Sequence, residues 1–528
     1  MRRWITGLVG TAFWLGAASS SALAQAMEPP GASADPAAAC SALARLDLTR
    51  TADAPATILS AKIDEAANGG KPFCKVNGVI MPQIQFEVRL PLGEAWNGRY
   101  FQTGCGGFCG AVPVENFADA QRMGFAVAAQ DMGHVGSVLS DPLWGESLEM
   151  RRDYGRRSSE VVAVTAKKVV EAFYGRAPDY SYFRGCSTGG REALSIAQYL
   201  PEAFDGVIAG DPAFPARQGG IANLWDTRQL LRRDGSEVLP APALTLLHKA
   251  VMDKCDMLDG AADGILTDPR MCDFDVRTLV CADGERAACL DAEQVLAVQR
   301  LYDGPRNSDG RRLAPSGRMF GSELSWETKA RAGLAEGYVR FLAFDQNPEP
   351  DYTIWDFDFD QDVERLETWA AVYDSVAPYK APDLTAFEAR GGKLIIYHGF
   401  ADATVSPINM IDFYAQVRQR QGGDAVGNWA RLFMVPGMFH CRGGDAPNQF
   451  DMLGPIMAWV ERDQAPDRIV ATQIADGQVK RTLPLTPYPE LPRYTGQGDV
   501  NDAANWAGTT TPAAKADERV DWNWAPRD

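Results

Sequence analysis

The stretch FRGCSTGGREAL, residues 183–194, contains a serine in a setting that predicts both a local structure and a chemical role. Ser187 lies between Gly185 and Gly189, which satisfies the pattern G-x-S-x-G. The apolar run YSYF at 180–183 predicts a strand before the serine, and REALSIAQYL at 191–200 predicts a helix after it. A serine on so sharp a turn exposes its hydroxyl, and the glycines leave room around it. A plain glycine-rich turn is the alternative, but the flanking strand and helix favour a nucleophilic serine.

Strand and helix patterns alternate on both sides of this turn. Apolar runs at 84–92, 99–104 and 125–131 predict strands, the spacing at 158–174 predicts a helix, and GVIAG at 206–210 predicts a buried strand. Two further strands are predicted at 391–399 and 430–437. This order is typical of an α/β fold with a parallel sheet.

The residues between these two halves show a different pattern. They contain four of the cysteines and many Asp, Gly and aromatic residues, without regular strand-helix alternation. We therefore predict a core made of residues 25–212 and 380–528. Residues 213–379 would form an inserted domain over the catalytic edge of the sheet.

The N-terminus and the cysteines both indicate an oxidising compartment. Residues 1–24 carry Arg2 and Arg3, an apolar run and then Ala-Leu-Ala, which predicts a signal peptide cleaved after Ala24. The apolar run is too short for a bilayer core of about 30 Å. Ten cysteines without a CxxC pair favour disulfides over zinc sites. We expect a secreted or periplasmic protein.

The overall charge limits the partners that we expect. The formal net charge is −17, and no cluster of five or six Lys or Arg occurs. Nucleic acids and anionic membrane surfaces would be repelled by such a field. The sequence does not indicate an oligomeric state.

A serine nucleophile needs a base, and the chain offers four histidines: His134, His248, His398 and His440. His440 follows the last predicted strand in PGMFHC, where an α/β-hydrolase places its base. Asp402 in HGFADATVS follows the strand LIIY and lies between serine and histidine in chain order, as the acid should. The alternative for Asp402 is a solvated loop carboxylate.

Two cysteines lie next to these residues in the sequence. Cys186 precedes Ser187, and Cys441 follows His440. If the serine and the histidine share a hydrogen bond, their neighbours come close enough for a disulfide, whose Cα atoms are about 4.4 to 6.8 Å apart. This bridge would hold the nucleophile against the base, or it would be an ordinary crosslink nearby.

The Cys-Ser, later Asp and His-Cys arrangement resembles that of the tannase and feruloyl esterase family, which includes bacterial mono(2-hydroxyethyl) terephthalate hydrolase. Further segments carry the resemblance along the chain: WNGRYF at 96–101, YHGFADA at 397–403, LFMVPGMFHC at 432–441, FDMLGPIMAWVERDQAPD at 450–467 and PRYTGQGDVN at 492–501. It implies an α/β-hydrolase fold with a large lid inserted between the nucleophile and the acid and base. The implied activity is hydrolysis of esters of aromatic acids, such as feruloyl or galloyl esters, through an acyl-enzyme.

An esterase also needs two donors for the developing oxyanion. One is the backbone N–H of Thr188, directly after the nucleophile. The second should come from TGCGGFCG at 103–110, where the resemblance implies Gly107, with Gly106 next. Cys105 and Cys109 in this loop depart from the family pattern. They form either a fifth disulfide or a pair of buried thiols.

Within the insertion, CDMLDGAADGI at 255–265 concentrates carboxylates in a short loop. Closely spaced Asp and Gly suit a calcium loop or a solvated acidic turn equally well. The resemblance implies a structural calcium ion held by the side chains of Asp256, Asp259 and Asp263 and the carbonyls of Ala261 and Ile265. It also implies the disulfides Cys40–Cys74, Cys255–Cys272 and Cys281–Cys289.

The substrate is less well indicated than the family. The insertion is rich in aromatic residues that would line the lid or, for most of them, form its own core: Trp225, Trp326, Tyr338, Phe341, Phe344, Tyr352 and Trp355. Terephthalate-ester hydrolases of the family use a lid arginine, and here Arg331 and Arg340 are only near the corresponding position. The alternatives are a terephthalate monoester hydrolase, a serine peptidase or amidase, and a non-catalytic calcium-stabilised protein that binds aromatic compounds.

Overall fold

A computed structural model describes residues 35–65, 70–139, 142–213, 216–282, 288–326, 329–366 and 382–517. The predicted signal peptide, with its cleavage site after Ala24, lies outside the described residues. Among the helices in these ranges, none is long and apolar enough to cross a membrane.

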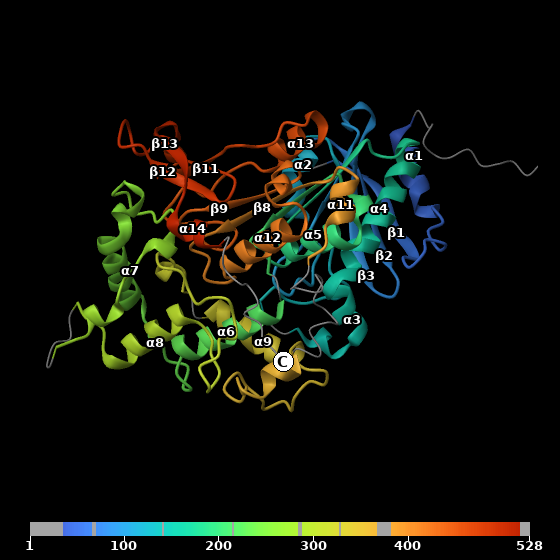
Figure 1. The fold of residues 1–528 in the computed structure, drawn as a ribbon. Helices are drawn as coiled ribbons and strands as arrows, with labels where there is room; N and C mark the ends of the chain where they lie inside the picture. The colour runs from blue at the N-terminus through green and yellow to red at the C-terminus, as the bar shows by residue number, and fades with distance from the viewer. Residues whose placement is uncertain are drawn as a thin grey trace, which may run out of the picture.

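A nine-stranded sheet runs through the molecule (Figure 1) in the order β1-β2-β3-β5-β4-β6-β7-β8-β9. Its strands are β1 (Ala56–Asp64), β2 (Phe73–Ile80), β3 (Ile84–Pro91), β4 (Arg99–Thr103), β5 (Ala126–Gln130), β6 (Tyr180–Cys186), β7 (Gly206–Gly210), β8 (Lys393–Gly399) and β9 (Ala430–Val435). From β1 to β5 the neighbours are antiparallel, and from β5 to β9 they are parallel. This sheet, with helices packed on it, is the predicted α/β-hydrolase fold.

Helices cover both faces of the parallel part. One face packs against α4 (Ser158–Tyr174), α5 (Thr188–Tyr199), α11 (Thr385–Ala389) and α12 (Ile408–Arg420), and the other against α2 (Ala118–Arg122) and α13 (Leu453–Arg462). Every residue of β5 and of β7 is buried as a result. This double coverage explains why the central strands are short, continuous apolar runs.

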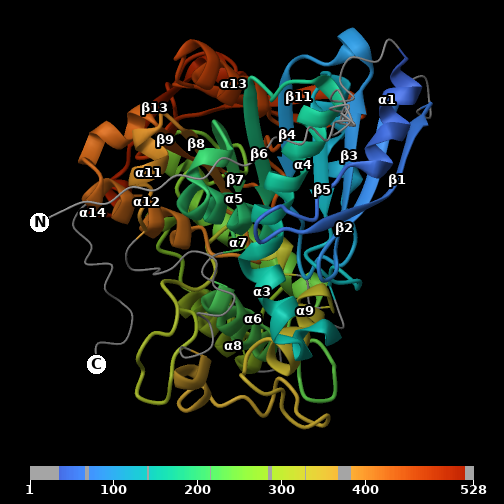
Figure 2. The same ribbon diagram turned by 90° about the vertical axis from the view of Figure 1, so that its right-hand side faces the viewer.

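The described part of the segment between β7 and β8 combines helices with long irregular stretches. It contains α6 (Ala216–Leu230), α7 (Ala241–Cys255), α8 (Ala292–Asp303) and α9 (Lys329–Phe341), which have hydrophobic clusters of their own. Figures 1 and 2 both place α6, α8 and α9 together beyond one end of the sheet. We call this segment the lid. Its boundaries at 213 and 379 stay predictions, and residue 379 lies outside the described residues.

Smaller elements complete the described chain. They are α1 (Pro36–Ala42), α3 (Leu148–Arg152), α14 (Pro512–Asp517) and two hairpins, β10 (Ile469–Ala475) with β11 (Gln478–Leu485) and β12 (Glu490–Tyr494) with β13 (Trp506–Thr510). The hairpins contact the acidic loop of the lid, since Ala261 packs with Leu483 and Trp506.

Candidate active site

Ser187 occupies a sharp turn between β6 and α5. Its backbone has φ 63° and ψ −123°, a strained conformation for a residue with a side chain. The turn is held by hydrogen bonds from Ser187 N to Gly210 O (3.0 Å) and from Ala213 N to Ser187 O (2.9 Å). A Cβ on Gly185 would lie 2.3 Å from Gly189 O, so the close approach inside the motif excludes a larger residue. Gly185 is therefore required by the geometry, whereas a Cβ on Gly189 would be tight, at 3.1 Å from Cys105 O.

The structure brings the three predicted residues into one hydrogen-bonded line. His440 Nε2 lies 2.8 Å from Ser187 Oγ, and His440 Nδ1 lies 2.7 Å from Asp402 Oδ2. The other oxygen of Asp402 accepts hydrogen bonds from Thr404 N (2.7 Å) and Val405 N (2.9 Å). The acid is thus fixed by its own loop and orients the imidazole. This is the arrangement of a nucleophile, a base and an orienting acid.

The charges in this line support that arrangement. Burial alone would raise the pKa of Asp402, but His440 and His398 outweigh it and hold the pKa below its ordinary value. Burial would lower the pKa of His440, but the Asp402 carboxylate outweighs it and raises the pKa above 6.5. An ionised Asp402 accepts a hydrogen bond from Nδ1–H of His440, which leaves Nε2 available to accept the proton of Ser187.

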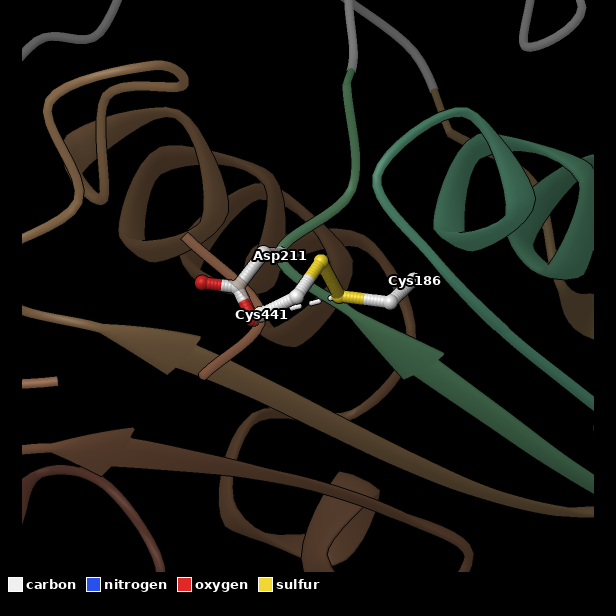
Figure 3. Close-up of side chains that lie close together, drawn as sticks. All are labelled: Cys186, Asp211 and Cys441. Atoms are coloured by element: carbon white, nitrogen blue, oxygen red, sulfur yellow. Dashed lines mark hydrogen bonds between the residues drawn. A yellow bond between two sulfur atoms is a disulfide. The ribbon is translucent and has the colours of Figure 1, made fainter. Parts of the chain in front are cut away.

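The predicted disulfide between Cys186 and Cys441 is confirmed, with Cα atoms 6.1 Å apart. Figure 3 shows the bridge between the end of β6 and the loop that carries His440. The other predicted pairs, Cys40–Cys74, Cys255–Cys272 and Cys281–Cys289, are also confirmed. Cys105 and Cys109 are bridged rather than free, so all ten cysteines are paired.

Both predicted oxyanion donors lie beside the nucleophile. Thr188 is the first residue of α5, so its N–H has no acceptor within the helix. Its hydroxyl donates to Gly107 O (2.8 Å), and the hydroxyl of Tyr154 donates to the same oxygen (3.1 Å). Gly107 has φ +53°, and a Cβ there would lie 2.1 Å from Val138 O. These contacts fix the Gly107 peptide next to the serine turn.

Ser187 and His440 open into a cavity of about 910 Å³. Its wall includes aliphatic Val138, Leu139 and Leu334, the last from α9 of the lid. Arg331 of α9 also lines the cavity, where its Nη1 donates to Asn223 Oδ1 (3.2 Å) and to Ala403 O. The lid thus contributes residues to the same cavity as Ser187.

The aromatic residues of the lid do not line this cavity where they are described. Trp326, Tyr338 and Phe344 are buried in the hydrophobic clusters of the lid. Arg340 lies over the ring of Phe341 and is not part of the cavity wall. These aromatic side chains thus belong to the core of the lid, which was the role favoured for most of them. The cavity wall combines aliphatic residues with polar and charged ones.

The acidic loop of the lid has features of a cation site. One carboxylate oxygen of each Asp caps the loop backbone: Asp256 accepts from Gly264 N (2.8 Å), Asp259 from Ala261 N (3.1 Å) and Asp263 from Ile265 N (3.2 Å). The second oxygen of Asp259 is buried without a hydrogen bond, and that of Asp263 is buried 3.6 Å from Arg481 Nη1. Burial raises the pKa of Asp259 to about 7 and that of Asp263 to about 6. A hard cation would fit these buried oxygens.

Three polar residues near Ser187, His440 and Asp402 were not predicted as part of the site. Glu192 of α5 accepts from Cys105 N (2.8 Å) and so connects the nucleophile helix to the loop at 103–110. His398 of β8 has Nε2 only 3.2 Å from Asp402 Oδ2. Asp211 directly follows β7 and lies beside Cys186. The position of Asp211 after a central strand, like that of Asp402 after β8, is a signal that could have drawn attention to it.

Comparison with known proteins agrees with this geometry. The family model "Tannase and feruloyl esterase" matches residues 69–508. Mono(2-hydroxyethyl) terephthalate hydrolase of Piscinibacter sakaiensis is 35% identical over 87% of this chain and 87% of its own. An uncharacterized esterase of Xanthomonas campestris is 33% identical over 90% and 92%. The crystal structure of feruloyl esterase B from Aspergillus oryzae superposes with a TM-score of 0.81 at 26% identity, covering 90% of this chain and all of that one. The chain therefore belongs to the tannase and feruloyl esterase family of carboxylic-ester hydrolases.

Proposed function

We propose that the protein is a secreted serine esterase that cleaves esters of aromatic carboxylic acids through an acyl-enzyme. The observation that carries this proposal is the hydrogen-bonded line from Asp402 through His440 to Ser187 at the floor of the cavity. Ser187 attacks the ester carbonyl while His440 accepts its proton, and the Thr188 and Gly107 amides stabilise the oxyanion. His440 then protonates the leaving alcohol, and water releases the acid by the same route.

Apolar residues in the cavity wall support an aromatic acyl group. Val138, Leu139 and Leu334 line the cavity that contains Ser187, and they would offer apolar surface to an aromatic ring. Relatives are named for feruloyl and terephthalate esters, which share such a ring. A terephthalate monoester is the second candidate, because Arg331 is in the cavity wall and could meet a free carboxylate.

We also propose that the acidic loop binds a calcium ion with a structural role. Asp256, Asp259 and Asp263, with the carbonyls of Ala261 and Ile265, would hold the ion. The buried Asp259 oxygen that lacks a hydrogen bond supports this assignment, as does the buried carboxylate of Asp263 in the same loop. The ion would hold the lid against the C-terminal hairpins, and no step of the hydrolysis involves it.

Location and partners follow from the sequence and the disulfides. Secretion is supported by the predicted signal peptide and by five disulfides. The formal charge of −17 argues against nucleic acid and anionic membranes as partners, so a small ester is the expected ligand.

The decisive experiment replaces Ser187 by Ala and measures hydrolysis of feruloyl, galloyl and hydroxyethyl terephthalate esters. We expect kcat to fall by on the order of 10⁴-fold or more, with an unchanged fold. Ser195→Ala is the matched control, because Ser195 lies on the same helix with a buried hydroxyl that lacks a hydrogen bond. Retained hydrolysis in Ser187→Ala would contradict the assigned nucleophile. An amide analogue of the best ester tests the peptidase alternative, and an inactive parent that binds the esters would indicate a binding protein.

A further inference from the structure

A second pair of buried titratable residues lies behind Ser187, His440 and Asp402. Asp211 is the first residue after β7, and His398 belongs to β8, the neighbouring parallel strand. Both side chains are fully buried. The hydrolysis described above uses neither of them, although burying a carboxyl and an imidazole costs free energy unless they interact.

Asp211 contacts the strands that carry the nucleophile and the acid. Its Oδ1 accepts a hydrogen bond from Gly399 N (3.0 Å) at the end of β8, just before the loop of Asp402. Its Oδ2 lies 3.5 Å from Cys186 Sγ, and Figure 3 shows the carboxyl group beside the disulfide. A disulfide sulfur has no proton to donate, so this contact is a hydrogen bond only when Asp211 itself carries the proton.

His398 connects Asp211 with Asp402. Its Nε2 lies 3.2 Å from Asp402 Oδ2, 3.1 Å from Val405 O and 3.9 Å from Asp211 Oδ1. Because all three neighbours are acceptors, Nε2 carries a hydrogen. Asp402 Oδ2 therefore accepts a hydrogen bond from His440 on one side and has the N–H of His398 3.2 Å away on the other. The nearest polar atoms of Asp211, His398 and Asp402 lie within 4.8 Å of one another.

The charges of this cluster depend on one another. Burial raises the pKa of Asp211 to about 6. Burial would lower the pKa of His398, but Asp211 and Asp402 outweigh it and raise the pKa. A pKa of about 6 makes Asp211 mostly a carboxylate above that pH. Its carboxylate is also among the groups that raise the pKa of His440.

We propose that Asp211 is a positioning residue of the hydrolytic site, whose carboxylate holds His398 against Asp402 and strengthens His440 as a base. The inference rests on the proposed roles of Ser187, His440 and Asp402. It adds a buried residue that acts on these groups through its charge and its contact with His398.

Other charged groups face the same cluster. Arg331 of the lid acts to lower the pKa of His440, in the direction opposite to Asp211. Tyr397, the neighbour of His398 on β8, is buried near Asp211 and has a raised pKa, so it stays neutral over the working range. The basicity of His440 is therefore a balance between Asp402 and Asp211 on one side and burial and Arg331 on the other.

The test is the pH dependence of kcat/KM for Asp211→Asn. Asparagine has the same size and can still accept from Gly399 N, but it carries no charge. The acid limb of this profile is the fall of kcat/KM at low pH. It reports the pKa of His440, which must be neutral to act as a base. The pKa of His440 is raised above 6.5, and that of Asp211 is about 6. In the parent, the acid limb therefore falls at a pH at which Asp211 is ionised. We expect the limb of the variant to shift to lower pH by about half a unit or more, with a lower plateau.

Asp205→Asn is the matched control. Asp205 precedes β7 while Asp211 follows it, and it accepts from Ser181 N (2.7 Å) and Arg390 Nη2 (2.7 Å). A five-residue strand separates the two carboxylates by roughly 15 to 20 Å. Asp205→Asn should reduce the melting temperature and leave the limb where it is.

An unmoved limb in Asp211→Asn would mean that His398 cancels the charge of Asp211, and it would overturn the inference, as would a shift to higher pH. Asp211→Ser removes the same charge with a smaller side chain and must shift the limb in the same direction, so it gives the answer if Asp211→Asn does not fold. Failure of the proposed function is a separate result, namely hydrolysis that survives in Ser187→Ala.

Discussion

Cys186 and Cys441 are joined by a disulfide, and each is the sequence neighbour of one partner in the 2.8 Å contact between Ser187 and His440. The bridge connects positions 255 residues apart and closes directly beside the reacting groups. It restricts the distance between the serine turn and the histidine loop, which no continuous secondary structure joins. Its position indicates a role in holding the nucleophile and the base together as well as in stability.

Replacing Cys186 and Cys441 together by Ala should therefore reduce both stability and turnover. We expect the free energy of unfolding to fall by about 2 to 5 kcal/mol. We also expect kcat per folded molecule to fall more than KM changes, because the contact between His440 and Ser187 loses its restraint. Denaturant unfolding and kinetics on titrated active sites measure the two effects.

The bridge between Cys40 and Cys74 provides the control, because it joins α1 to β2, at the edge of the sheet opposite β9. Replacing this pair by Ala should reduce stability and leave kcat unchanged. Equal kcat in both double variants would mean that the Cys186–Cys441 bridge only stabilises the fold.

The sequence was most informative where a residue's role is set by local structure. Ser187 could be predicted because a strand, two glycines and a helix form its turn within a few residues. Asp402 and His440 followed from chain order after central strands, and Cys186–Cys441 followed from them. The strands β1 and β2 were missed, because polar residues interrupt their apolar residues without a strict alternation, in ATILSAKID of β1 and FCKVNGVI of β2.

The parts of the site that depend on tertiary contacts could not be predicted. Glu192 is one polar position in the helix predicted after Ser187, and only the folded chain shows that it meets Cys105 N. Arg331 and Arg340 are both on α9, but only Arg331 reaches the cavity. The choice between a bridge and free thiols for Cys105 and Cys109 was likewise decided by distances.

Glu192→Gln should impair the loop at 103–110, which carries the proposed oxyanion donor Gly107. Glu192 accepts from Cys105 N (2.8 Å), from Gln130 Nε2 (2.8 Å) and from the hydroxyl of Ser159, so both of its oxygens serve as acceptors. A glutamine has one oxygen, and its NH₂ group would face a donor. We expect a loss of about 1 to 3 kcal/mol in stability and a lower kcat at nearly constant KM. A change in KM alone would place the effect on substrate binding instead.

The Cys105–Cys109 bridge should support the same loop more weakly. It closes a short loop, with a sequence separation of 4, so its removal should cost only about 2 kcal/mol. Other contacts remain, including Phe108 N to Val138 O at 2.8 Å. The loss of kcat in Cys105→Ala/Cys109→Ala should be smaller than in Glu192→Gln, and the two changes combined should be non-additive because they act on one loop. Strict additivity in the kcat of the combined variant would show that they act separately.

Removing divalent cations should destabilise the lid while the chemical step continues. The second carboxylate oxygen of Asp259 is buried without a hydrogen bond, and that of Asp263 lies 3.6 Å from Arg481 Nη1, so calcium would supply the partner that Asp259 lacks. An ion present at 100 times its dissociation constant adds about 2.7 kcal/mol to the stability of the folded state. We expect a chelator to lower the melting temperature, calcium to restore it, and kcat at 25 °C to stay constant.

Asp259→Asn should abolish the response to calcium, whereas Asp360→Asn, in the acidic run at 356–362, should preserve it. A parent whose melting temperature ignores both chelator and calcium would contradict the proposed ion, and a kcat that depends on calcium would contradict its structural role.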